Sequence, residues 1–146
     1  MTPLDVARKE IGTAEHPPDT NRTKYGEWFG LNGVPWCGIF VSWCFDRAGV
    51  VLPKIGFSKP GFAGCQTAVA YWRREGRVVT KAQPGDIVFY DWNGDGRYDH
   101  TGIFDTRISD THFWAIEGNT AVNNDSNGGT VMRRKRPYRR AIFVRP

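Results

Sequence analysis

The thiol of Cys37 stands at the start of a run with helical spacing, a position that could make it a nucleophile. Apolar residues follow at offsets of three and seven, Phe40 and Cys44, and Gly49 is a residue type that often ends a helix. Pro35 precedes the cysteine by two residues, where a chain entering a helix tolerates proline. Cys37 is therefore expected in the first helical turn, where unpaired backbone N–H groups and the helix dipole stabilise a thiolate.

A histidine and a glutamate lie in two strand-like segments of the second half of the chain. Joined as a hairpin, these segments have a natural register that pairs Phe104 with Phe113. Stepping by two residues along the same face then places His100 opposite Glu117. The sequence therefore predicts an imidazole beside a carboxylate on one face of a hairpin.

The same face carries two very small residues, Gly102 and Ala115, between this pair and the two aromatic rings. Small residues in a strand leave room for another element to approach, and we expect that element to be the helix of Cys37. Asn119 lies two residues beyond Glu117 and points to the same side of its strand.

These residues supply what hydrolysis by a cysteine needs: a thiolate, a base that also protonates the leaving group, and a group that orients the base. Cys37 would be the nucleophile, His100 the base and acid, and Glu117 with Asn119 the orienting groups. The alternative is purely structural. Cys37 would then pack as a small apolar residue, and the histidine and glutamate would merely link two strands.

The periodicity of the chain predicts helices first and strands after them. Helical spacing indicates helices over residues 3–11, 21–29, 37–48 and 65–75. Alternation indicates strands over residues 86–90, 100–104, 112–119, 130–133 and 141–144. This order favours an α+β fold with N-terminal helices packed on one face of an antiparallel β-sheet. With 146 residues, we expect a single domain that spans 1–146.

The charge balance is basic, with a formal net charge of +5 and arginines clustered near the C-terminus. Such a surface suits nucleic acid, acidic lipid, or a wall polymer with phosphates and carboxylates. No nucleic-acid-binding motif accompanies the charge, so we expect no nucleic-acid partner. The chain opens without the pattern of a signal peptide, and no stretch is long enough to span a membrane. We expect a monomer without membrane insertion.

Three cysteines, an odd number without a close pair, do not have the pattern of a disulfide framework. We expect Cys44 and Cys65 to be structural thiols, and a bridge between these two stays open.

The loop ahead of His100 has the spacing of a calcium-binding loop. Oxygen-bearing side chains fall at positions 1, 3, 5 and 9, and Gly96 falls at position 6, where such loops turn sharply. The ligands would be Asp91, Asn93, Asp95, the carbonyl of Arg97, and Asp99. Position 12 lacks the glutamate of an EF-hand, so the loop resembles the DxDxDG-type loops of β-hairpins. The alternative is a polar turn that binds nothing. An ion here would be structural rather than part of the chemistry.

Four blocks of the sequence resemble the CHAP family, the cysteine, histidine-dependent amidohydrolases and peptidases. The blocks are residues 32–44, 84–88, 99–103 and 116–120, in the order in which the family has them, and the resemblance covers nearly the whole chain. It implies a papain-like α+β fold and cleavage of peptidoglycan, at the amide between glycan and stem peptide or within the peptide. It also implies Cys37 as nucleophile, His100 as base and acid, and Glu117 and Asn119 as orienting groups, with no cofactor needed for the chemistry.

Many CHAP relatives are catalytic modules of bacteriophage lysins or bacterial wall hydrolases, which implies action at the bacterial cell wall. Since the chain shows no recognisable wall-binding repeat and no signal peptide, we expect an excised domain, or a minimal phage enzyme released through the host membrane. Two other functions stay open. The thiol machinery could act on an acyl or protein substrate, or the chain could be an inactive wall-binding or calcium-stabilised module.

Overall fold

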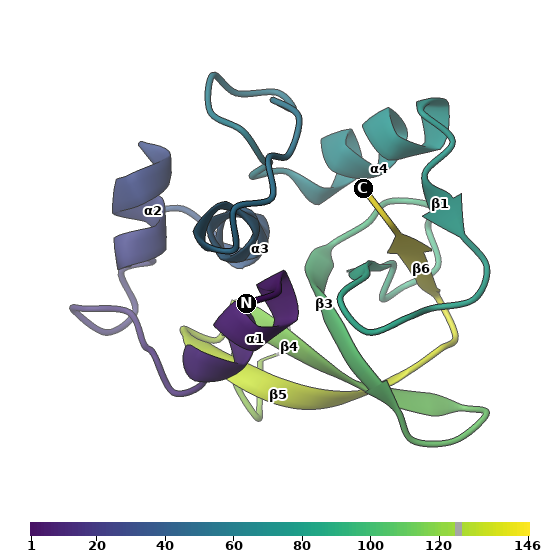
Figure 1. The fold of residues 1–146 in the computed structure, drawn as a ribbon. Coiled ribbons are helices and arrows are strands. Elements are labelled where there is room, and N and C mark those ends of the chain that lie inside the picture. The colour runs from purple at the N-terminus through teal and green to yellow at the C-terminus, as the bar shows by residue number, and fades with distance from the viewer. Residues whose placement is uncertain (125–126) are drawn as a thin grey trace.

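The computed structural model describes residues 1–124 and 127–146, and it places helices on one side of an antiparallel sheet (Figure 1). In these residues the helices are α1 (Pro3–Lys9), α2 (Lys24–Phe29), α3 (Cys37–Arg47) and α4 (Cys65–Arg74). The strands of the same residues are β1 (Val78–Val79), β2 (Ile87–Tyr90), β3 (His100–Arg107), β4 (His112–Thr120), β5 (Thr130–Pro137) and β6 (Ala141–Val144). The predicted α+β fold is confirmed.

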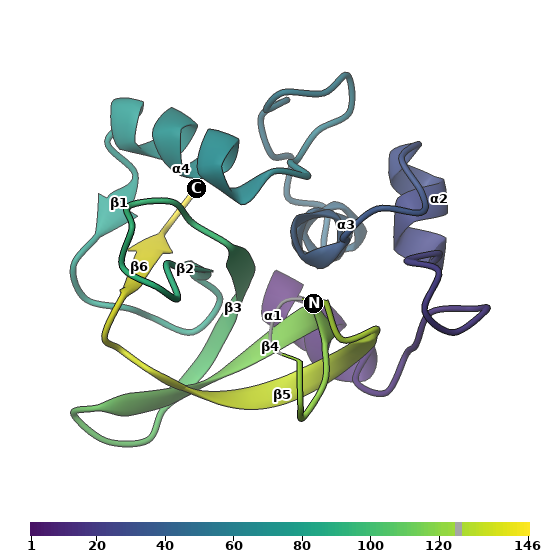
Figure 2. The same cartoon turned by 180° about the vertical axis from the view of Figure 1, so that it is seen from behind.

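The strands follow the order β1-β6-β2-β3-β4-β5 across the sheet, so the last strand of the chain lies between β1 and β2. Figures 1 and 2 show β4 and β5 running beneath α1 and α3. Three strands differ from the sequence prediction by more than one residue, and one of them is β3, which extends to Arg107 rather than ending at residue 104. The short edge strand β1 was not expected, and β5 extends to Pro137 rather than ending at residue 133.

Helix α3 is the centre of the helical layer, and its residues from Cys37 to Phe45 are all buried. The residue before it, Trp36, is also fully buried, and its indole N–H donates to a carboxylate oxygen of Glu15 at 2.9 Å. The first hydrogen bond of the helix runs from the N–H of Phe40 to the carbonyl of Trp36. The N–H groups of the first turn therefore have no acceptor within the helix, as the sequence predicts.

The two faces of the sheet carry separate apolar clusters. The face under the helices contributes Ile87, Phe89, Ile103 and Ile116 to the main core. The opposite face carries a smaller cluster of Val88, Tyr90, Phe104, Phe113, Ala115 and Phe143. Because successive side chains of a strand point to opposite faces, the alternation read from the sequence fixes which residues enter each cluster.

The predicted register of the β3–β4 hairpin is wrong by two residues. Phe104 pairs with Ala115 instead of Phe113, and Arg107 pairs with Phe113. A bulge between Phe104 and Thr106 adds a residue to β3, and β3 continues to Arg107, beyond the predicted end at residue 104. Before the bulge the shift is two residues, so the side chains of β3 up to Phe104 keep their predicted face, because the period of a strand is two.

The expected packing of α3 against Gly102 and Ala115 is also wrong. Ala115 belongs to the cluster on the far face of the sheet. The glycine that admits the helix is Gly118, since a Cβ added there would lie 2.7 Å from the ring of Trp36 and 2.8 Å from the Cβ of Phe40. Helix α3 thus approaches the face opposite to the one predicted.

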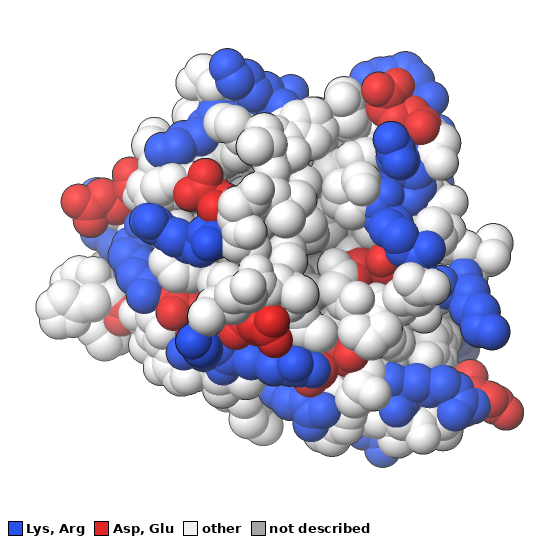
Figure 3. All heavy atoms as spheres, in the orientation of Figure 1, with Lys and Arg blue, Asp and Glu red and all other residues white. Residues whose placement is uncertain are grey.

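Basic side chains are spread widely over the surface. Figure 3 shows Lys and Arg over much of the face seen in Figure 1, with acidic residues fewer and interspersed. None of the helices in the described residues is long and apolar enough to cross a membrane.

Candidate active site

Cys37 is the first residue of α3, and its side chain is 5% exposed. A hydrogen bond from the thiol of Cys65 lowers the pKa of Cys37 well below its usual range, against the effect of burial, and His100 lowers it further. The N–H of Gly38 acts in the same direction. The site therefore favours the thiolate, as the sequence predicts for a cysteine in a first helical turn.

His100 is the first residue of β3 and is fully buried. Its ring stacks on those of Tyr90 and Trp92, with centroids 5.9 and 6.1 Å away. Its Nε2 lies 3.0 Å from Oε1 of Glu117. Its Nδ1 has no hydrogen-bond partner in the residues that the structure describes.

The protonated form of His100 is stabilised by the groups on either side of it. Burial would lower the pKa of the imidazole, but the charge of Glu117 and then the contact with Cys37 raise it to about 9. With the pKa of Cys37 lowered, the two side chains favour a thiolate and an imidazolium at neutral pH.

Glu117 is fully buried in β4 and is held by a residue that sequence reasoning missed, Arg136 of β5. Arg136 donates from Nε to Oε2 of Glu117 at 2.9 Å and from Nη2 to Oε1 at 2.5 Å. Burial would raise the pKa of Glu117, but His100 and Arg136 lower it to about 2. The carboxylate therefore stays ionised across the range in which a cysteine hydrolase works.

Arg136 is itself only 4% exposed, and its guanidinium lies over the rings of Tyr90 and Trp92 at 5.5 and 4.8 Å. The sequence prediction ended β5 four residues too early and counted this arginine with the basic C-terminal cluster. Residues 133–136 are all basic and show no alternation, so no sequence signal marked the continuation of β5 through residue 137, which carries Arg136 into the sheet beside Glu117.

Gly102 has a different role from the one predicted. A Cβ at Gly102 would lie 2.6 Å from Cγ of Glu117 and 2.9 Å from the carbonyl oxygen of Ile116. The missing side chain therefore makes room for Glu117, which crosses this space to reach His100. The predicted contact between imidazole and carboxylate is present even though the register that suggested it is wrong.

A comparison with known families gives a match. The model of the CHAP domain matches residues 29–119, which include Cys37, His100, Glu117 and Asn119 and end before Arg136. The chain belongs to the CHAP family.

Among solved structures, this CHAP chain is similar to the crystal structure of a wild-type endolysin, LysIME-EF1, with a TM-score of 0.56 and 14% sequence identity. The match covers 100% of this chain and 65% of the endolysin chain, so this chain spans less than two thirds of that length. At such low identity the likeness concerns the fold alone. A comparison with curated proteins gave no match.

Asn119, the second predicted orienting group of this CHAP domain, is fully buried near the end of β4. Its backbone has a φ of 58°, in the left-handed region, and it lies in the irregular stretch between Glu117 and Thr120. Asparagine tolerates this conformation better than most residues. The structure gives the contact with Nε2 of His100 to Glu117, and a catalytic role for Asn119 stays a prediction.

The structure has no bridge between Cys44 and Cys65, the pairing that the sequence left open. All three cysteines are free, and the sulfur near Cys65 is that of Cys37, at 4.0 Å, rather than that of Cys44. Burial raises the pKa of Cys44 well above its usual range, as expected of an inert structural thiol.

The predicted calcium ligands lie in one loop between β2 and β3. The described residues bring no three His, Cys, Asp or Glu side chains together as a metal-binding group. Both carboxylate oxygens of Asp91 accept N–H groups of the loop, from Gly94 at 2.9 Å and from Gly96 at 2.8 Å. Asp95 accepts the N–H of Arg97 at 2.8 Å, and Asp99 accepts that of Trp92 at 3.2 Å. In this arrangement, the loop carboxylates cap the turn.

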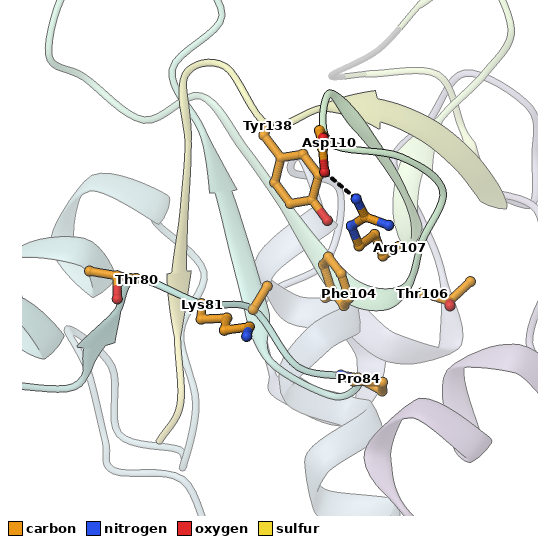
Figure 4. A pocket seen from close by; sticks show the side chains of 9 residues that line it. Thr80, Lys81, Pro84, Phe104, Thr106, Arg107, Asp110 and Tyr138 are labelled. Atoms are coloured by element: carbon orange, nitrogen blue, oxygen red, sulfur yellow. Dashed lines mark hydrogen bonds and ion pairs between the residues drawn. The ribbon is translucent and has the colours of Figure 1, made fainter.

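A pocket of about 390 Å³ lies at the other end of β3 from His100 (Figure 4). It is lined by Phe104, Thr106 and Arg107 of β3, with Tyr138 and the segment around Pro84. The ion pair of Arg107 with Asp110 closes one side of it in the figure. Cys37, His100 and Glu117 are not among its lining residues, so this pocket is separate from the candidate active site.

Proposed function

We propose that this CHAP domain, residues 1–146, hydrolyses an amide or peptide bond of bacterial peptidoglycan with Cys37 as the nucleophile. The observation that carries the proposal is the buried series Cys37, His100, Glu117. A thiol at a helix start faces an imidazole whose far nitrogen is hydrogen-bonded to an ionised carboxylate. The chain's membership of the CHAP family supports the class of reaction.

In the proposed reaction, the thiolate of Cys37 attacks the carbonyl carbon of the scissile bond. The unpaired N–H groups of the first turn of α3 are the donors available to the oxyanion. The imidazolium of His100 then protonates the leaving nitrogen, and a thioester remains on Cys37. His100 takes a proton from a water that attacks this thioester, the acid is released, and the thiol is restored.

Glu117 acts in this sequence through His100. Its contact with Nε2 holds the ring so that Nδ1 is the nitrogen available to the reacting groups, and its charge stabilises the imidazolium. A cysteine hydrolase needs both effects, because the same imidazole must hold a proton after the thiolate forms and release it to the leaving group.

The surface supports an anionic polymer as substrate. Next to Trp92, which stacks near His100, lies a concave surface of about 350 Å³ lined by Trp92, Pro137, Arg139 and Arg140. Peptidoglycan stem peptides carry carboxylates, and arginines are well suited to bind them. We therefore propose that the protein acts at the bacterial cell wall and that this surface contacts acidic groups of the polymer.

The test is turbidity loss of purified sacculi, with the wild type beside Cys37→Ala. We expect lysis by the wild type and none by the variant, with unchanged circular dichroism, because the substitution removes little volume. Mass spectrometry of the released muropeptides then distinguishes an amidase, which frees the glycan from stem peptides, from an endopeptidase. A wild type that leaves sacculi intact, or equal lysis by Cys37→Ala, would overturn the proposal in favour of another thiol substrate or an inactive module.

We propose separately that residues 91–99 bind calcium in a structural role. The support is the spacing of Asp91, Asp95 and Asp99, which fall at positions 1, 5 and 9 of a calcium-loop pattern. One carboxylate oxygen of Asp95 accepts the N–H of Arg97 and one of Asp99 accepts that of Trp92, so an ion would use the lone pairs that remain. The loop leads into β3, and an ion there would act by holding the start of that strand.

A further inference from the structure

The nucleophile of the proposed site has a second thiol beside it. The sulfur atoms of Cys37 and Cys65 lie 4.0 Å apart, and each cysteine is the first residue of a helix, α3 and α4 respectively. Both are largely buried, with exposed fractions of 5% and 8%. In the hydrolytic steps Cys65 forms no covalent bond and acts only through its contact with Cys37, which lowers the pKa of that thiol.

The starts of α3 and α4 are held together by hydrogen bonds between the Ser42 hydroxyl and backbone groups. The hydroxyl of Ser42 accepts the N–H of Phe62 at 2.9 Å and donates to the carbonyl of Gly38 at 2.8 Å, which ties the segment before α4 to α3. Gly38 allows close approach, because a Cβ there would lie 2.9 Å from the carbonyl oxygen of Ala63. The proximity of the sulfurs is thus built into the packing of α3 against residues 62–64.

We propose that Cys37 and Cys65 form a reversible disulfide when a hydroperoxide oxidises Cys37. In the first step, the thiolate of Cys37 attacks a peroxide oxygen, the O–O bond breaks, and a sulfenic acid forms, while the leaving oxygen takes the proton of the His100 imidazolium and departs as water or an alcohol. In the second step, the sulfur of Cys65 attacks the sulfur of Cys37, and hydroxide leaves with the proton of Cys65 as water. Two thiols are oxidised, one hydroperoxide is reduced, and the sulfurs approach by about 2 Å.

The order of these steps follows from the different character of the two thiols. The contact with Cys65 and the nearby His100 lower the pKa of Cys37, and the same contact raises the pKa of Cys65 well above its usual range. The thiolate is the form that reacts with peroxide, so Cys37 reacts first and Cys65 resolves the sulfenic acid. Cys44 is fully buried farther along α3 and serves as the internal control.

The proposal concerns the two sulfur atoms and does not depend on which bond the enzyme cleaves. A disulfide would occupy the nucleophile and block hydrolysis, whereas a thiol reductant would restore it. Without Cys65, the sulfenic acid of Cys37 would proceed to the sulfinic and sulfonic acids, which such reductants do not reverse.

The experiment treats the wild type, Cys65→Ser, Cys65→Ala and Cys44→Ser with hydrogen peroxide, and maps the products by mass spectrometry. We expect a mass loss of about 2 Da and a peptide linking residues 37 and 65 in the wild type and in Cys44→Ser. We expect mass gains of one to three oxygens on Cys37 in both Cys65 variants. Dithiothreitol should return the first two proteins to their starting mass and the Cys65 variants only in part.

Lysis of sacculi is measured before and after the reductant. In every variant that lyses sacculi, activity should return to the extent that the reductant restores the starting mass. A bridge to Cys44, or equal accumulation of irreversible oxidation with and without Cys65, would overturn the proposal. If the wild type does not lyse sacculi but still forms the 37–65 bridge, the hydrolase function fails and the oxidation site stands.

Discussion

Replacement of Arg136 by methionine tests whether the buried carboxylate of the site depends on its ion pair. The guanidinium makes two hydrogen bonds to Glu117, of 2.9 and 2.5 Å, and both side chains are almost completely shielded from water. Methionine keeps most of the length and apolar surface of the arginine stem but removes the charge. Glu117 would then keep His100 as its remaining charged neighbour at the site.

Two arguments give the size of the effect. Removing one partner of a buried ion pair usually costs about 3–5 kcal/mol, because the other charge stays buried. The lowering of the pKa of Glu117 from 4.5 to about 2 corresponds to about 3 kcal/mol, which His100 and Arg136 share. We therefore expect Arg136→Met to lower the free energy of unfolding by about 3 kcal/mol at pH 7, and Tm by about 6–12 °C.

The pH dependence of stability is a second, independent test of the ion pair. A folded-state pKa of about 2 for Glu117 means that its contribution to stability is complete above its unfolded value of 4.5 and is lost as pH falls through about 2. Without Arg136, the pKa of Glu117 rises. The part of the stability that the wild type loses between pH 4.5 and about 2 should therefore be smaller in Arg136→Met, so the difference between the two proteins narrows on acidification.

The assay is urea unfolding at pH 7 followed by circular dichroism, with Arg139→Met as the matched control. Arg139 is exposed, and its replacement should change stability by less than about 0.5 kcal/mol. The double variant Glu117→Gln with Arg136→Met removes both charges and should recover at least half of the loss. If Arg136→Met is as stable as Arg139→Met, or if the double variant loses the sum of the single losses, the reasoning is refuted.

Three further predictions concern the site and its loop. The rate of lysis should fall as pH rises through about 9, where His100 loses its proton. Glu117→Gln should lower this rate by orders of magnitude and move the fall to lower pH. An unchanged pH profile in the variant would contradict the assignment of Glu117. Asn119→Ala should cost less activity than Glu117→Gln in the same turbidity assay, and an equal loss would make Asn119 a full partner. Millimolar calcium should raise the Tm of the wild type but not that of a variant with Asp91 and Asp95 both changed to Ala. Identical melting curves of the wild type in calcium and in EDTA, with no heat of calcium binding in calorimetry, would rule out the calcium site.

The sequence by itself determined the classes of structure and the faces of the strands. Helical spacing placed Cys37 in a first helical turn, and alternation put His100 and Glu117 on one face of a hairpin. The second result holds although the predicted register was wrong, since a shift of two residues moves a partner along the strand without changing its face. Periodicity carries this information because it depends only on residues that are close together in the sequence.

Only the tertiary structure decided which side of the sheet α3 covers, which group holds Glu117, and which thiol lies beside the nucleophile. Gly118 rather than Gly102 admits the helix, and Arg136 comes from a strand whose end the sequence misplaced. The neighbour of Cys37 is Cys65, at the start of another helix. Each of these contacts joins segments far apart in the chain, and their meeting depends on bulges and close packing that no local pattern encodes.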